Sequence, residues 1–391
     1  MQAKLKKWFG LSLVSAAHAE THIQVSAYSL VYPYVINYFN ITYADLGLLL
    51  GAVNLINGLL QGVYGLLSNY IKRKYLCGGG NVMVGLTMIA TAFSSSFPLF
   101  STFRILGAIG SSPQHPTASS LISDWFERRE RGKALTIHTS AGNIGTLIAP
   151  LIIGFLIPIL GWRDALFIFG IPGFIFGILV MLLVEDRKSI TIEQRKVAKS
   201  YIKVLKDTNI LKLYAARSII AGGRGLGVAL TFIPLYLVNY LHLSSQIVGG
   251  LYTILAAGSV ISPILGAHIS DILGSRKLII IPSLAMSASG SIILLLTGHN
   301  ILGIIIALLI IGMFLFNEDP LSQALLSDII KDERRDSAFS LYYMINYTSG
   351  AIWSIILGLI LSLLGFRALF ETMLFSYLVG ALIISTVKEK D

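Results

Sequence analysis

The chain has 391 residues, of which 54% are hydrophobic and 13% are charged, and its formal net charge is +10. A soluble protein would be about one quarter charged, so the composition excludes an ordinary soluble enzyme. Residues 165–184 and 278–298 contain no ionisable side chain, and about 20 such residues let a helix cross hydrocarbon. A β-barrel is excluded because its strands alternate in polarity. We therefore predict an all-α integral membrane protein.

The positive charge lies in clusters at alternate turns between the apolar runs. The clusters occupy residues 4–7, 72–74, 127–133, 185–212, 276–277, 331–335 and 388–390. The other turns carry only Arg163 and Arg367. This asymmetry follows the positive-inside rule. It predicts a multi-pass protein of the plasma membrane with both termini cytoplasmic, and the lipid bilayer rather than nucleic acid as its partner.

Twelve helices are predicted in chain order from the apolar spans. Their expected ranges are 9–38, 45–70, 77–97, 98–124, 133–160, 163–184, 210–240, 245–272, 277–298, 300–328, 336–364 and 366–387. The stretch 185–209 is too charged to cross the membrane and is expected to be an amphipathic, basic cytoplasmic linker. It separates two predicted domains of six helices each, residues 1–184 and 210–391.

The two predicted domains are copies of one unit. Residues 37–47 resemble 239–249 at an offset of 202, while 115–124 and 160–167 resemble 319–328 and 364–370 at an offset of 204. Three separated segments that share one offset within two residues indicate a duplication, and hence two pseudosymmetric six-helix bundles. The start of the chain resembles a secretory leader that ends at Ala17-His18-Ala19. Cleavage is not expected, because helix 1 aligns with the internal helix 7.

Ionisable side chains inside the predicted spans are candidates for function, since they are costly in hydrocarbon. They concentrate in helices 1, 4, 7 and 10, which are the same element of a repeat of three helices and can all face one central cavity. They are His18, Glu20, His22, Arg104, His115, Arg217, Arg224, Glu318 and Asp319. The offsets match His22 with Arg224, and Gln114 and His115 with Glu318 and Asp319.

The histidines of helix 1 raise a metal hypothesis that the spacing does not favour. His18 and His22 are four residues apart and share one face, whereas Glu20 points elsewhere together with Gln24. Zinc proteases use H-E-x-x-H, and this chain has H-x-E-x-H, so no metal is expected. Hydrogen bonding between helices and a substrate or proton site both stay open for His18 and His22. His138 is interpreted as a packing residue.

Glu318 and Asp319 follow sixteen uncharged residues and precede Pro320, which can bend the helix. Two adjacent carboxylates in a low-dielectric medium cannot both stay ionised without a counter-charge. They are either a structural ion pair with Arg217 or Arg224, or reversible proton carriers.

The whole chain resembles the major facilitator superfamily in its twelve helices, its six-plus-six duplication and its long basic central loop. The turn after helix 2 is similar to the family's G-x3-D-x2-G-R-R motif, with Asn69 in the place of Asp and with Arg73 retained. The turn after helix 8 keeps Asp271 and Arg276. The resemblance implies that these turns gate the cytoplasmic side.

Two further signatures bear on the class of transporter. Arg104-x2-Gly107-x2-Gly110 is similar to the family's helix 4 signature, and Arg104 is therefore either a packing anchor or part of the coupling machinery. The stretch 142–154 resembles the glycine-proline signature of antiporters, although Ala149 replaces one glycine. His18-x3-His22 and residues 46–51 resemble the fosmidomycin-resistance-type efflux branch, in which paired acids are not expected.

We therefore predict a proton-coupled secondary transporter of a small polar or anionic organic molecule, which works by alternating access as a monomer and needs no cofactor. Antiport is preferred. The alternatives are a symporter for an organic anion or sugar acid, a non-transporting sensor and a metal-dependent membrane protein. The predicted substrate-binding residues are His18, His22, Tyr28, Tyr32, Gln114, His115, Arg217, Arg224 and Asn317. The predicted proton-coupling residues are Glu20, Arg104, Glu318 and Asp319.

Overall fold

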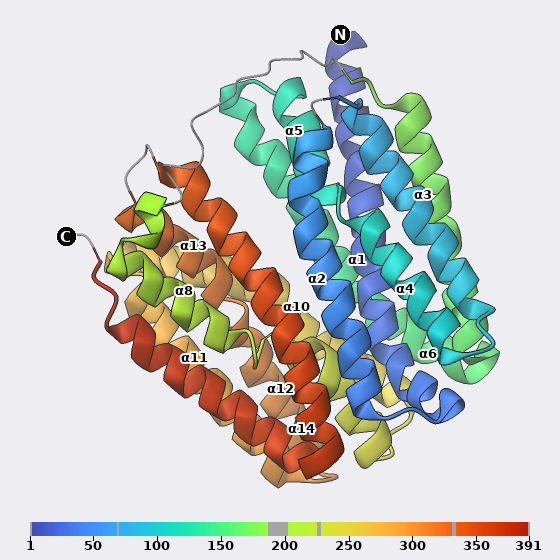
Figure 1. The fold of residues 1–391 in the computed structure, drawn as a ribbon, viewed down its shortest axis with the longest axis vertical. Coiled ribbons are helices and arrows are strands. Elements are labelled where there is room, and N and C mark those ends of the chain that lie inside the picture. Colours follow the sequence, from blue (N-terminus) through green and yellow to red (C-terminus); the bar gives the residue numbers. More distant parts are fainter. Residues whose placement is uncertain (1, 69, 187–201, 225–227, 331–333, 390–391) are drawn as a thin grey trace. The chain divides into compact units, whose positions relative to one another are not determined.

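The computed structural model describes residues 2–68, 70–186, 202–224, 228–330 and 334–389, and all regular structure in these ranges is helical (Figure 1). The first half contains α1 (Gln2–Phe39), α2 (Tyr43–Leu67), α3 (Arg73–Ala92), α4 (Phe97–Ser111), α5 (Gln114–Trp125) and α6 (Arg128–Leu183). The second half contains α8 (Thr208–Ile220), the π-helical η1 (Val228–Phe232), α9 (Ile233–Leu235), η2 (Tyr236–Tyr240), α10 (Ser245–Leu273), α11 (Lys277–Thr297), α12 (Ile301–Leu315), α13 (Glu318–Ile329) and α14 (Arg335–Ser385).

Two of these helices are each a pair of membrane spans joined without a loop. α6 has 56 residues and α14 has 51, more than twice the length that one span needs. Gly161 and Gly365 interrupt them with φ of 82° and 78°, a conformation that favours glycine. When α6 and α14 are divided there and the other kinked helices are joined, the described residues form the twelve predicted helical segments.

The predicted helix 98–124 and its copy, the predicted helix 300–328, break at equivalent positions. α4 gives way to α5 at Ser112–Pro113, and α12 gives way to α13 at Phe316–Asn317, 204 residues later. Pro116 and Pro320 lie in the first turns of the second segments. A proline ring clashes with the carbonyl four residues earlier, which is that of Ser112 for Pro116 and that of Phe316 for Pro320. Equivalent prolines therefore bend both helices.

The predicted helix 210–240 is not one continuous α-helix. α8 ends at Ile220, residues 221–224 form turns, and much of the segment from 228 to 240 is π-helical. Gly223 lets the ring of Tyr377 pack against this turn, because a Cβ there would lie 2.5 Å from that ring. The Tyr377 hydroxyl also donates a hydrogen bond of 2.5 Å to the Gly223 carbonyl, which holds the turn in place.

The chain forms two compact units. The first comprises residues 1–41 and 52–193, and the second comprises residues 42–51 and 194–391. Residues 187–201 lie outside the described ranges, so the predicted linker helix and the domain limits at 184 and 210 stay predictions.

The packing inside the two units repeats. In the first unit α1 packs on α6, and α3 packs on α4 and α6. In the second unit α8 packs on α14, and α11 packs on α12 and α14. Each unit therefore packs its first helix against its fifth helix, and several of the polar side chains described next lie on these helices.

Candidate functional site

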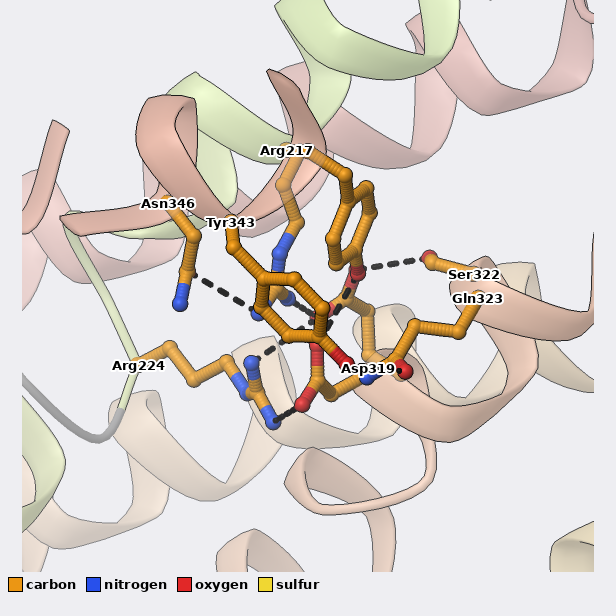
Figure 2. A network of polar contacts seen from close by, with 9 residues as sticks. Arg217, Arg224, Asp319, Ser322, Gln323, Tyr343 and Asn346 are labelled. Atoms are coloured by element: carbon orange, nitrogen blue, oxygen red, sulfur yellow. Dashed lines mark hydrogen bonds and ion pairs between the residues drawn. The ribbon is translucent and has the colours of Figure 1, made fainter. Parts of the chain in front are cut away.

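Arg217 lies at the centre of an ion-pair network in the second unit (Figure 2). Its side chain and that of Glu318 are each only 1% exposed, and its Nη1 contacts Glu318 Oε2. Its Nη2 donates to Asp319 Oδ1 at 2.7 Å and to Asn346 Oδ1 at 3.0 Å. A buried guanidinium needs such compensation, and Arg217 receives it from α13 and α14.

Arg224 completes the charge balance with longer contacts. Its Nη1 lies 3.6 Å from Glu318 Oε2, and its Nη2 lies 3.4 Å from Asp319 Oδ2. Two arginines thus face two carboxylates, and the network carries no net charge. The sequence left open which arginine the acids hold. The structure places both against them, and Arg217 makes the closer contacts.

Three further residues of the network were not predicted. The Tyr342 hydroxyl donates to Asp319 Oδ1 at 2.9 Å, Ser322 Oγ donates to Glu318 Oε1 at 2.8 Å, and Asn346 accepts from Arg217. Tyr342 and Asn346 are four residues apart in α14 and therefore share a face. This spacing could have marked both residues as site candidates, because two polar side chains share one face of a predicted membrane span.

The first unit has a cluster of histidines where the second unit has charged side chains. The ring centroid of His18 lies 4.6 Å from that of His22 and 5.1 Å from that of His115. Three of the predicted substrate-binding residues therefore lie together. His138, interpreted from the sequence as a packing residue, stacks on His18 at 4.2 Å. The offset of 204 pairs His138 with Tyr342, and this correspondence could have marked both residues.

Two glycines of α6 allow this helix to approach the histidines of α1. A Cβ on Gly142 would lie 2.7 Å from His18 Cε1 and 3.0 Å from His22 Cδ2, and a Cβ on Gly145 would lie 2.3 Å from the Ala19 carbonyl oxygen. The glycines of the predicted antiporter signature therefore serve local packing between α1 and α6.

Arg104 belongs to a separate polar group in the first unit. Its guanidinium carbon lies 3.8 Å from the ring centre of Tyr28, and its Nε donates to the Tyr32 hydroxyl at 3.2 Å. No carboxylate among the described residues lies within 4.0 Å of it. Gln24, Asn57, Thr87 and Ser111 contribute polar groups to the lining of the pocket beside Arg104.

Three predicted site residues lie apart from these groups. Glu20 accepts a hydrogen bond from Gln24 Nε2 at 3.1 Å, on the face expected for that pair. Gln114 accepts from the Cys77 thiol at 3.1 Å and so faces α3. Asn317 donates to Ser283 Oγ at 3.3 Å and faces α11, away from the network of the adjacent Glu318.

The predicted gating turns hold arginine–aspartate pairs. Arg73 pairs with Asp124 in the first unit, and Asn69 lies outside the described residues. In the second unit Arg276 pairs with Asp271, and its Nε lies 3.3 Å from Asp328. The pKa of Arg276 is raised, first by its hydrogen bond to Asp271, so this guanidinium stays charged.

Comparison with known proteins gives matches along the whole chain. The family model described as "Major Facilitator Superfamily" matches residues 16–236 and 213–390. A probable hexose phosphate transport protein of Chlamydia muridarum is 29% identical over 143 residues. That match covers 37% of this chain and 31% of the relative, so the alignment spans about a third of the relative's length.

Other matches extend further at lower identity. The hexuronate transporter of Escherichia coli is 21% identical over an alignment that covers 97% of this chain and 94% of the relative. The crystal structure of a D-xylose-proton symporter superposes with a TM-score of 0.79 at 18% identity and covers 97% of this chain and 98% of that chain. The structural match supports the predicted fold.

Proposed function

This chain belongs to the Major Facilitator Superfamily, and from that premise we propose that it is a proton-coupled secondary transporter of a sugar acid or sugar phosphate. In this proposal two six-helix bundles alternate access to a central site, as inverted-repeat transporters do. The chain works as a monomer in the plasma membrane with both termini cytoplasmic. The relatives named as hexose phosphate and hexuronate transporters support this class of substrate.

The observation that carries the substrate class is the position of Arg104. In the second unit both embedded arginines have carboxylate partners. Arg104 lies on Tyr28 and Tyr32 in a pocket with amide and hydroxyl side chains, and no described acid balances its charge. A guanidinium matches a carboxylate or phosphate with two parallel hydrogen bonds. We therefore assign Arg104 to the anionic group of the substrate rather than to the proton.

Asp319 is the proton carrier in this proposal. Its side chain is 28% exposed, whereas that of Glu318 is 1% exposed. A proton needs a water route, and only the carboxylate of Asp319 offers one to an appreciable extent. Glu318 is then the permanent partner of Arg217.

Protonation of Asp319 would release Arg224. The contacts of Arg224 with the acids are the longest of the network, at 3.4 and 3.6 Å. When Asp319 becomes neutral, one positive charge loses its balance, and Arg224 is the arginine held less tightly. Arg224 would then attract the anionic substrate, which couples the proton to substrate binding.

Proteoliposome flux tests the coupling. Asp319→Asn should abolish accumulation driven by a pH gradient and keep substrate exchange between the two sides at zero gradient. Asp164→Asn removes an exposed acid of α6 outside the polar groups described above and should behave as wild type. Gradient-driven accumulation by Asp319→Asn would place the carrier elsewhere, with Glu318 and Glu20 as the remaining predicted proton-coupling acids.

Ligand-dependent thermal stabilisation of the purified protein tests the substrate class. Glucuronate or glucose 6-phosphate should stabilise the wild type, neutral glucose should not, and Arg104→Gln should lose the effect. Equal stabilisation of Arg104→Gln would overturn the role of Arg104. Applying the pH gradient in each direction distinguishes antiport from symport. Binding without any flux would identify a sensor and overturn the proposal of transport.

A further inference from the structure

The histidines of the first unit have a geometry that the transport proposal does not use. One nitrogen from each of His18, His22 and His115 lies within 4.8 Å of the others. The planes of the three rings are nearly perpendicular to one another, with angles of 82°, 81° and 86°. Three imidazole nitrogens that lie this close together can bind one metal ion.

The hydrogen bond of His18 determines which of its nitrogens is free. His18 Nδ1 lies 3.0 Å from the backbone carbonyl of His138, and a carbonyl can only accept. Nδ1 therefore carries the proton, and Nε2 has a free lone pair. His18 is only 3% exposed, and its Nε2 has no hydrogen-bond partner in the described part of the chain. A buried acceptor of this kind points to a ligand.

His22 is held in the same way by α6. Its Nδ1 lies 3.0 Å from Thr146 Oγ1. The Thr146 hydroxyl already donates its proton to the Gly142 carbonyl at 3.2 Å. Its oxygen therefore accepts from Nδ1–H of His22, and His22 also presents an unprotonated Nε2. Fixing the tautomer through the far nitrogen is the usual support of a histidine that binds a metal.

From this geometry we infer that His18, His22 and His115 form a binding site for a divalent transition-metal ion, with Zn²⁺ as the best match. Imidazole nitrogen suits zinc, copper and nickel, whereas calcium and magnesium require oxygen ligands. His18 and His22 form the i, i+4 pair of one helix, and His115 adds a ligand from α5. The third ligand comes from a distant part of the sequence, which is why the spacing H-x-E-x-H did not predict it.

The site needs only a small closure to bind the ion. Zinc binds imidazole at about 2.0–2.1 Å, which places the ligand nitrogens about 3.4 Å apart in a tetrahedron. The present limit of 4.8 Å thus requires side-chain movement of about 1 Å. His115 is exposed and provides the entry path. Three protein ligands leave one position for water or an anionic oxygen, as in open zinc sites.

Zinc binding to the purified full chain tests the inference without any transport measurement, so it can fail independently of the proposed function. The metal-stripped protein should bind one Zn²⁺ per chain in competition with a chromogenic chelator, and millimolar Mg²⁺ should not compete. His22→Gln and His115→Gln should each weaken binding by about 100-fold or more, and Thr146→Val, which removes only the support of His22, by about 10-fold to 100-fold. His268→Gln removes an exposed histidine of α10 and should bind as wild type.

The fold of each variant is checked by its thermal unfolding without zinc, and the exposed His115 is the substitution least able to disturb packing. X-ray absorption at the zinc edge should show three imidazole nitrogens at about 2.0–2.1 Å. Unchanged zinc affinity in a folded His115→Gln variant would overturn the site. A wild-type spectrum with fewer than three imidazoles would do the same.

Discussion

The first unit gathers imidazoles where the second gathers guanidinium and carboxylate groups, at matching positions of the duplicated chain. The offset of 202 pairs His22 with Arg224, and the offset of 204 pairs His115 with Asp319. Each group lies where the first helix of its unit meets the broken fourth helix. At these two positions the duplication has kept a polar side chain while its chemistry has diverged.

The comparison also shows what each chemistry requires. Neutral imidazoles need hydrogen bonds but no counter-ion, and His18 and His22 obtain them from α6. A buried guanidinium needs a carboxylate, so Arg217 can exist only beside Glu318 and Asp319. The second unit should therefore depend far more on single residues for its stability than the first.

Glu318→Gln should give the largest effect on stability. The substitution leaves Arg217 with one carboxylate and the network with a net positive charge, at a cost of about 3–5 kcal/mol of unfolding free energy. Denaturant unfolding of the purified protein measures it. Gln114→Leu, at the equivalent position of the first unit, serves as the comparison and should cost less, since Gln114 accepts only a weak thiol hydrogen bond.

A double variant separates charge imbalance from lost packing. Arg217→Met combined with Glu318→Leu removes one charge of each sign and leaves Arg224 with Asp319, so most of the lost stability should return. A double variant as unstable as Glu318→Gln would mean that the shape of the network, and not its charge balance, holds the second unit together.

Gly145→Ala should have an intermediate effect that is confined to the first unit. Its Cβ would lie 2.3 Å from the Ala19 carbonyl oxygen, so α1 and α6 must separate, at about 1–3 kcal/mol. The second unit has the larger Ser349 at the equivalent position. Gly132→Ala in the same helix meets nothing within 4 Å and should leave thermal stability unchanged or raise it.

Much of this arrangement could be predicted from the sequence because the duplication is an internal comparison. The breaks near Pro116 and Pro320 and the pairing of His115 with Asp319 follow from one offset and the chemistry of proline. The spacing of His18 and His22 also predicted their shared face. These inferences needed only helical geometry and the position of each residue relative to its copy.

The partners of single side chains could not be predicted in the same way. Gln114 and His115 are neighbours in sequence, yet one contacts Cys77 on α3 and the other meets His18 on α1. Successive helical residues point about 100° apart, and the rotation of a helix depends on all its neighbours at once. The turns at 221–224 depend on Tyr377, more than 150 residues later, which no local pattern reveals.

The loop pairs should give the smallest effect and the finest test of the comparison between the units. Arg73 has Asp124 as its carboxylate partner within the described ranges, whereas Arg276 contacts both Asp271 and Asp328. Asp124→Asn leaves Arg73 without a described carboxylate, and Asp328→Asn leaves Arg276 its closer partner.

Both acids are largely exposed, so each substitution should cost less than about 1 kcal/mol, with the larger loss for Asp124→Asn. Thermal unfolding at low ionic strength should resolve the difference, and about 1 M salt should remove it, because screening then acts within about 3 Å. Equal losses for the two variants would show that Asp271 does not compensate for the loss of Asp328, and a difference that survives high salt would show that its origin is not electrostatic.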